Sequence, residues 1–599
     1  MELNSASITD VIHPTAAFSQ SPQRTPPASI EPPSWLESQL NPKNRIDSLD
    51  PPKHPSWRVD GCTGLATQYY VVPLFLGDIP PMRFDVFIPE EATESLLVRQ
   101  LLDLNAAFHT KDADRVKRLG ITTHILRTLQ VWTEQGGEGA PQSIAEMYTT
   151  LPFGSRIVFE NLELDIRNIR ITIVPTHYIE TQLLRLGNLA PSLDVPSEAI
   201  PEAIEISRLS FVQQLHDSIC LVRIRPTAQG THQEKHGEQE SDRLWILKAL
   251  TSGTRYLYAE LQNLLRIKPH PHVISRPKYL VTKDCRFGNK IGVVGFLLHY
   301  HATGSLRDHL PLLRIHGQLT LEAQTKWAIQ LASAVLHVRE QGRIFYPDLR
   351  LDNIVLSDIG DIVMVDFEQR GVWCEFAAPE VNALEYIRIL AVDEYAERDT
   401  EPTLQEEVRE RYAGLLSKLL PDWEFLQSEQ FGPLPRNYTS YNISWQCLSP
   451  TEQEAAEVYM LGRVLWCIFE GQSAPQHAAV WQSYTREPDF EFPTFKQTPP
   501  EIRDLINCCT RGRRGVLSQL VARRGSKLVL CDSNTDEVQN AAEVLRVARE
   551  WWTAEVKVAE DFLQMRLQRI QEGRWDGNYY DRPSLRDVVA TLEQFRANL

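Results

Sequence analysis

The chain has 599 residues and a mass of 68.5 kDa, with 42% hydrophobic residues and a formal net charge of -16. This length provides several domains' worth of material with substantial cores, and the negative charge argues against a general nucleic-acid binder. The nine cysteines are odd in number and lack C-x-x-C spacing, so neither a zinc site nor a disulfide framework is predicted.

The first segment, residues 1–58, is rich in Pro, Ser and Gln and poor in aromatic residues. Such a composition cannot bury enough apolar surface to order itself, so we expect a disordered arm. The start lacks a basic region followed by an apolar stretch, and the longest apolar helix, Val458 to Phe469, is too short to span a bilayer and contains Arg463. We therefore expect a cytoplasmic or nuclear protein without membrane association.

Residues 59–200 differ in composition from the arm and predict an accessory mixed α/β domain. Residues 69–76 and 156–174 are typical of strands, and residues 91–108 and 122–133 of helices. No residue pattern here indicates chemistry. Two roles remain open: the domain braces the part of the chain that follows, or it binds a partner.

Farther along, residues 320–341 are rich in helix formers, and Trp327, Leu331 and Val335 recur at four-residue spacing, which predicts a long helix with one buried face. Residues 354–356 and 362–365 are short apolar runs separated by a turn at residues 358–360 and predict a hairpin.

Two polar motifs flank this hairpin. Residues 346–353 read Y-P-D-L-R-L-D-N, and Asp366 opens D-F-E thirteen residues after Asn353. This spacing is typical of phosphoryl transfer from a metal-bound nucleotide, in which the protein mainly positions a hydroxyl and neutralises charge. We expect Asp348 to orient or deprotonate the attacking hydroxyl and Arg350 to face the transferred group. Asn353 and Asp366 are the predicted magnesium ligands.

The order of motifs resembles the eukaryotic-type protein kinase superfamily. Residues 244–248, L-W-I-L-K, resemble the third strand of the kinase small lobe, and residues 269–274, P-H-P-H-V-I, resemble its H-P-N-I-V connection. Residues 293–306 are similar to the hinge strand with its G-S-L exit. The resemblance implies that Lys248 holds the nucleotide phosphates and that Glu260 is its ion-pair partner. The implied adenine pocket consists of Ile246, the gatekeeper Leu298, and His299, Tyr300 and His301 along the adenine edge.

Downstream, residues 378–380, A-P-E, resemble the end of an activation segment, and residues 457–466 resemble the buried helix of the large lobe. Residues 582–584, R-P-S, resemble the family's last motif, which makes Arg582 the implied partner of Glu380. The implied fold is α+β and bilobal, with a small lobe at 201–303 and a large lobe at 304–599 that carries insertions at about 381–448 and 511–577. The chain most resembles large fungal kinase-like proteins.

Several positions depart from the family pattern. Residues 206–224, at the place of the phosphate-covering loop, contain no glycine, Ile246 stands where a small alanine is usual, and Glu368 replaces the glycine after D-F. No serine, threonine or tyrosine lies between Asp366 and Glu380, so we expect no activation by phosphorylation there.

Three functions therefore remain open. The first is ATP- and magnesium-dependent phosphorylation of a protein serine or threonine hydroxyl, and the protein substrate is unknown. The second is a pseudokinase scaffold that binds nucleotide weakly or not at all. The third is a small-molecule kinase of the choline or aminoglycoside type, whose metal motif often carries an acidic residue after an aromatic one, as D-F-E does.

Overall fold

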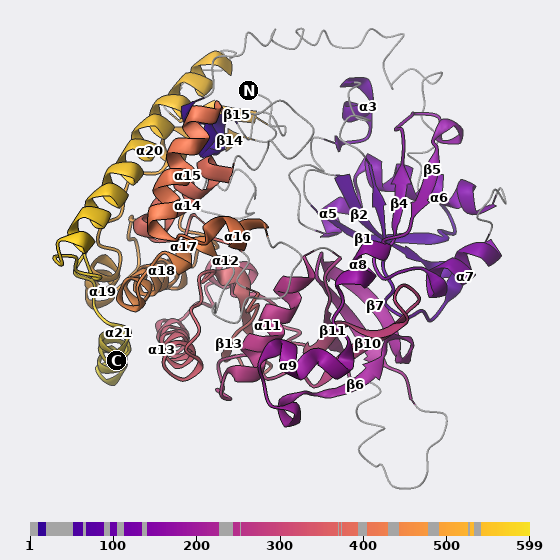
Figure 1. Cartoon of the computed structure of the whole chain (residues 1–599), viewed down its shortest axis with the longest axis horizontal. Helices are drawn as coiled ribbons and strands as arrows, with labels where there is room; N and C mark the ends of the chain where they lie inside the picture. Colours follow the sequence, from indigo (N-terminus) through magenta and orange to yellow (C-terminus); the bar gives the residue numbers. More distant parts are fainter. Residues whose placement is uncertain are drawn as a thin grey trace.

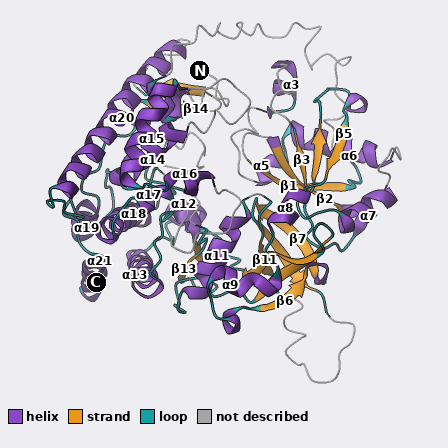
Figure 2. Cartoon of the chain, in the orientation of Figure 1, coloured by secondary structure: helices purple, strands orange, loops and turns teal. Residues whose placement is uncertain are grey.

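The computed structural model describes most of the chain as a mixed α+β fold (Figures 1 and 2). The described residues are 10–18, 52–63, 67–88, 96–104, 113–134, 141–226, 243–251, 253–368, 371–372, 374–392, 404–428, 442–476, 490–524, 527–531 and 541–599.

The first layer is a five-stranded sheet in the order β1-β2-β3-β4-β5. Its strands are β1 (Trp57–Thr63), β2 (Gln68–Pro73), β3 (Phe84–Phe87), β4 (Arg156–Phe159) and β5 (Ile171–Val174). β3 and β4 are parallel, and the crossover between them contains α3 (Leu96–Leu101), α5 (Ala113–Val116), α6 (Gly120–Glu134) and α7 (Pro141–Thr150). α6 presents buried Ile121, Ile125 and Leu129 at four-residue spacing, so one face of this helix packs into the core.

The second layer is a six-stranded sheet in the order β6-β10-β11-β9-β8-β7. Its strands are β6 (Glu202–Glu205), β7 (Leu209–His216), β8 (Ile219–Ile224), β9 (Trp245–Lys248), β10 (Tyr279–Cys285) and β11 (Lys290–His299). α11 (Thr254–Arg266) connects β9 to β10, while α8 (His177–Gln182) and α9 (Leu189–Leu193) precede β6. β7 lies at the edge of this sheet.

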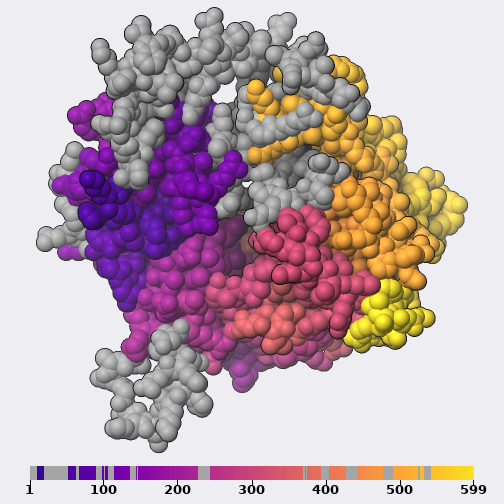
Figure 3. Space-filling model, turned by 180° about the vertical axis from the view of Figure 1, so that it is seen from behind, coloured from indigo at the N-terminus to yellow at the C-terminus, as the bar shows by residue number. Residues whose placement is uncertain are grey.

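The two sheets share one hydrophobic core. Val59, Phe84 and Ile157 from the first sheet belong to the same buried cluster as Val222 and Leu247 from the second. In Figure 3 the two parts form a continuous surface. The predicted accessory domain is therefore packed directly onto the six-stranded sheet.

The remaining part is mainly helical and surrounds α18, which is buried along nearly its whole length. Its helices are α12 (Leu306–Ile315), α13 (Leu321–His337), α14 (Pro379–Val392), α15 (Glu406–Leu419), α16 (Trp423–Ser428), α17 (Ile443–Gln446), α18 (Pro450–Glu470), α19 (Pro500–Cys509), α20 (Ala541–Gln571) and α21 (Leu585–Ala597). Two hairpins accompany them: β12 (Ile354–Leu356) with β13 (Ile362–Met364), and β14 (Val521–Arg524) with β15 (Lys527–Leu530).

The expectation of a disordered arm over residues 1–58 is wrong for two segments. Residues 10–18 contain a 3-10 helix, Pro14–Ala17, and pack against the C-terminal helices, where the Trp552 indole donates a hydrogen bond of 2.8 Å to the Val11 carbonyl. β1 begins at Trp57, inside the predicted arm. Val11 and Trp57 are both buried, which gives these segments the apolar contacts that the average composition concealed. The rest of the arm lies outside the described residues.

Within the described part of the chain, none of the helices combines the length and the apolar character needed to cross a membrane.

Candidate functional site

Lys248 lies at the end of β9, between β8 and β11, and its ammonium group meets three carboxylates. Its Nζ lies 3.2 Å from Glu260 Oε2 on α11, 2.8 Å from Asp366 Oδ1 after β13, and 3.2 Å from Glu368 Oε2. Lys248 and Glu260 are only 2% and 1% exposed. Since burying an isolated charge is very unfavourable, this arrangement depends on the close pairing of opposite charges.

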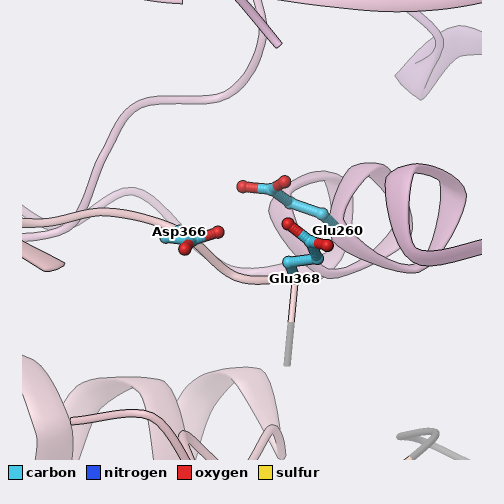
Figure 4. A group of neighbouring side chains, drawn as sticks. All are labelled: Glu260, Asp366 and Glu368. Atoms are coloured by element: carbon cyan, nitrogen blue, oxygen red, sulfur yellow. The ribbon is translucent and has the colours of Figure 1, made fainter. Parts of the chain in front are cut away.

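Figure 4 shows the carboxylates of Glu260, Asp366 and Glu368 turned toward one another. One oxygen from each lies within 4.8 Å of the others, so the three could share a cation. The sequence named Glu260 and Asp366 as site residues but assigned Glu368 no contact. The signal available was the acidic residue of D-F-E, two positions after Asp366.

The charges in this group change one another's protonation. Burial by itself would lower the pKa of Lys248, but Asp366, Glu260 and Glu368 outweigh it and hold that pKa well above its ordinary value. Burial raises the pKa of Glu260 to about 7, helped by Asp366 and opposed by Lys248. Burial would also raise the pKa of Asp366, but Lys248 holds it below its usual value, with smaller effects of the same sign from Arg350 and His216. Lys248 is therefore a permanent cation that faces ionised Asp366.

The backbone around Asp366 is fixed by hydrogen bonds from two other elements. Asp366 has a φ of 64°, a left-handed conformation that is unusual for a residue with a side chain. The Phe367 amide donates to Glu260 Oε1 at 3.1 Å, and Asn263 Nδ2 donates to the Phe367 carbonyl at 3.2 Å. Tyr346 donates from its hydroxyl to the Val365 carbonyl and packs edge-on against Phe367 with ring centroids 5.1 Å apart. α11 therefore positions both Lys248 and the D-F-E segment.

Asp348, Arg350 and Asn353 form a second polar group on the loop before β12. Asn353 Nδ2 donates to the Asp348 side chain and to its carbonyl, both at 3.0 Å, and Arg350 Nε lies 3.3 Å from Asp348 Oδ1. The Val365 amide donates to the Asn353 carbonyl at 2.9 Å, which places this loop beside the residue preceding Asp366.

Burial raises the pKa of Asp348 to about 6, with Arg350 opposing the shift and Asp366 adding to it. The hydrogen bond from the Val365 amide to the Asn353 carbonyl places the two polar groups next to each other.

The residues expected along an adenine edge lie at the end of β11. Leu298 is directly opposite Ile246 on β9, and both side chains pack in the core at this strand pair. His299 Nδ1 lies 2.6 Å from an Arg243 guanidinium nitrogen, and its ring contacts that of His301 with centroids 4.7 Å apart. Tyr300 follows directly after the last residue of β11.

Two buried carboxylates outside the site connect it to the helices. Glu380 at the start of α14 forms an ion pair with Arg582, as the sequence predicted, and the Arg582 side chain is fully buried. Glu457 on α18 accepts a hydrogen bond of 3.2 Å from the Tyr346 amide and pairs with Arg339 at 2.9 Å. α18 therefore supports the loop that carries Asp348.

A cavity of about 830 Å³ lies apart from these residues. It is lined by parts of α14 and α20 and by residues 512–518, including Arg513 and Arg514. Arg514 pairs with Glu555 at 2.6 Å, so its charge is compensated within the chain. None of the predicted site residues lines this cavity.

A comparison with models of protein families finds no match for this chain. The functional argument therefore depends on the residues and their geometry.

Proposed function

We propose that this chain is a bilobal, protein-kinase-like phosphotransferase that uses ATP and magnesium and acts on a serine or threonine hydroxyl of a protein. The observation that carries the proposal is the contact of Lys248 with both Glu260 and Asp366 at 3.2 and 2.8 Å. These residues are separated by up to 118 positions, and a lysine between an α-helical glutamate and a metal-binding aspartate is what phosphoryl transfer requires.

Each polar residue has a role in this proposal. Lys248 would bind phosphate oxygens, and Asn353 and Asp366 are suited to hold Mg²⁺ because amide and carboxylate oxygens are its preferred ligands. Asp348 would orient the hydroxyl and receive its proton, and Arg350 beside it would compensate charge on the transferred group. ATP supplies the phosphoryl group and the metal neutralises its charge. In this view the six-stranded sheet with α11 is the small lobe, and residues 304–599 form the large lobe.

The other two functions each have one supporting observation. A pseudokinase scaffold is favoured by the threefold pairing of Lys248, because Glu260, Asp366 and Glu368 must release it before it can bind a phosphate. A small-molecule kinase is favoured by the convergence of Asp366 and Glu368, which could both serve as metal ligands.

Calorimetric titration of the full chain with Mg-ATP, followed by transfer of radiolabelled γ-phosphate to a generic basic protein, tests the main proposal. Wild type should bind nucleotide and transfer phosphate, whereas Asp348→Asn should lose at least 100-fold in turnover with binding retained. Asp352→Asn is the matched control, because this nearby carboxylate pairs with Arg307 on α12 at 2.7 Å. Equal turnover by Asp348→Asn and wild type would refute the assignment. If the wild-type chain binds no nucleotide, the pseudokinase scaffold is the function that remains.

Glu368→Gln separates the two kinase types. In the protein-kinase reading the substitution removes a negative charge beside the phosphates and one competitor for Lys248, so affinity for Mg-ATP should rise about threefold or more. If Glu368 is a metal ligand, affinity should fall instead, and transfer should proceed to a small alcohol rather than to a protein.

A further inference from the structure

The edge of the six-stranded sheet is held by the first sheet. β7 is the edge strand, and an uncovered edge presents unpaired backbone groups. Here the Phe211 amide donates to the Ile79 carbonyl at 2.8 Å, and Arg58 donates to the Val212 carbonyl at 2.9 Å. The Gln214 amide donates to Asp60 at 2.8 Å. These contacts follow β7 along its length toward its turn with β8.

The strongest contact is made at the turn itself. Arg83, from the segment just before β3, donates to Asp85 and also to Asp217, where Nη2 lies 2.6 Å from Oδ1. A second guanidinium nitrogen donates to the Asp217 carbonyl. Arg83 and Asp85 are buried and the Asp217 side chain is 24% exposed, so the guanidinium end of both ion pairs is shielded from water.

The backbone of Arg83 indicates that this contact is structurally demanding. Its φ is 62°, in the left-handed region that favours glycine, and a residue with a side chain there carries strain of about 1 kcal/mol or more. Such a conformation persists only where surrounding contacts fix it. The buried ion pair with Asp85 and the partly buried one with Asp217 supply those contacts.

The turn also reaches the carboxylate site. Ile219, the first residue of β8 directly after the turn, is paired with Lys248 on β9. Gln214 Nε2 donates to the His216 carbonyl at 2.5 Å, and the Ala249 amide, next to Lys248, donates to the Ser218 carbonyl at 2.9 Å. The turn is thus connected on one side to the first sheet and on the other to the strand that carries Lys248.

We infer that Arg83 is a positioning residue: by binding Asp217 it holds the glycine-free turn at residues 214–219 in a fixed place beside Lys248, next to the position where the nucleotide phosphates would bind. A glycine-rich loop can adapt its conformation to a triphosphate because glycine allows many backbone conformations. A loop in which every residue has a side chain must be placed in advance, and the first sheet provides that placement. This inference depends on the proposed nucleotide-binding function, and it gives the accessory domain the bracing role rather than the partner-binding role.

Hydrogen exchange and nucleotide titration on the full chain test the inference together. Arg83→Ala should speed amide exchange at residues 209–224 by about tenfold or more and weaken Mg-ATP binding by about tenfold. Arg83→Lys should restore part of the slow exchange and part of the Mg-ATP affinity, because an ammonium group can reach one of the acceptors on Asp85 and Asp217 but not all of them.

Lys283→Ala is the matched control. Lys283 on β10 forms an equally buried ion pair with Glu180 on α8 at 3.1 Å, away from the edge strand. The Lys283→Ala variant should be less stable than wild type, but amide exchange at residues 209–224 should be unchanged. Unchanged exchange in Arg83→Ala, or a loosened turn that binds Mg-ATP as tightly as wild type, would overturn the inference. If wild type binds no nucleotide, the proposed function fails, and the exchange result alone decides whether Arg83 holds the turn.

Discussion

Asp348 must be ionised to receive a proton, yet its surroundings favour the neutral form. Burial raises the pKa of this carboxyl from 3.8 to about 6, even though Arg350 lies 3.3 Å away and Asn353 donates to it. A pKa near 6 leaves Asp348 ionised at neutral pH, but closer to the pKa of a useful base than an exposed aspartate is. The same shift has a consequence for stability.

Asp348→Asn should stabilise the fold at neutral pH. Because the folded pKa of about 6 exceeds the unfolded value near 4, wild type is relatively stabilised below pH 4 and loses that contribution as pH rises through 6. Asparagine stays neutral at every pH and loses no such contribution. The free energy of unfolding of the variant at pH 7.5 should therefore exceed that of wild type by on the order of 1–2 kcal/mol, and this difference should shrink toward pH 5. Urea denaturation at both pH values measures it. A variant less stable than wild type at pH 7.5 would contradict the prediction.

The identities of the candidate site residues and the contact between Lys248 and Glu260 followed from the sequence, but other contacts did not. Spacing and family resemblance singled out Lys248, Glu260, Asp348 and Asp366, because the chemistry fixes residue types at short intervals along the chain. The contacts of Glu368 with Lys248 and of Arg83 with Asp217 were not predicted. They depend on the direction of side chains across packed elements, which local patterns do not encode.

Among the elements, those with strong local patterns were predicted closely. The expected helix at 320–341 is α13 (Leu321–His337), followed by a π-turn at residues 338–342, and the expected hairpin is β12–β13. Residues 156–174, expected to be strand, form β4 and β5 with a 3-10 turn between them. Of the predicted helix at 91–108, residues 96–104 are described and α3 spans Leu96–Leu101; the rest of this prediction lies outside the described residues. These differences arise where tertiary packing, rather than propensity, decides where an element ends.

α14, α18 and the start of α21 meet at the buried pair of Glu380 and Arg582. The guanidinium group also donates to the Ala455 carbonyl at 2.9 Å and lies over the rings of Tyr459 and Tyr580, each 4.8 Å from its centre. An ion pair with this many satisfied donors fixes three helices relative to one another.

Arg582→Ala should lower the free energy of unfolding by about 3–5 kcal/mol, because it leaves the Glu380 carboxylate buried without its partner. The matched control is Arg586→Ala on α21, whose ion pair with Glu340 is largely exposed and should contribute about 1 kcal/mol or less. Urea denaturation compares the two. If both variants lose a similar free energy of unfolding, the buried ion pair contributes no more to stability than the exposed one, and the prediction is wrong.

Across the whole molecule, residues 10–18 pack against residues that lie more than 500 positions later in the chain. Val11 shares a small buried cluster with Val521 and Leu528 of the β14–β15 hairpin and with Val544 and Ala548 of α20. Phe18 packs edge-on against Tyr412 of α15 with ring centroids 5.8 Å apart. In Figure 1 the indigo segment lies beside α14, α15 and the yellow α20. Residues 10–18 therefore contact both α15 and α20.

Val11→Asp should release residues 10–18 from α20. Val11 is completely buried, so the substitution forfeits about 1.5–3 kcal/mol of apolar burial and adds the cost of desolvating a carboxylate. Hydrogen exchange should then accelerate at residues 13–18 and in the first half of α20, while exchange in β7 and β8 stays unchanged. Val558→Asp is the matched control, since this valine on α20 is 36% exposed and tolerates a charge. Equal protection of residues 13–18 in wild type and Val11→Asp would mean that the indole hydrogen bond to the Val11 carbonyl and the contacts of Phe18 suffice to hold the segment, and that the buried valine is not its anchor.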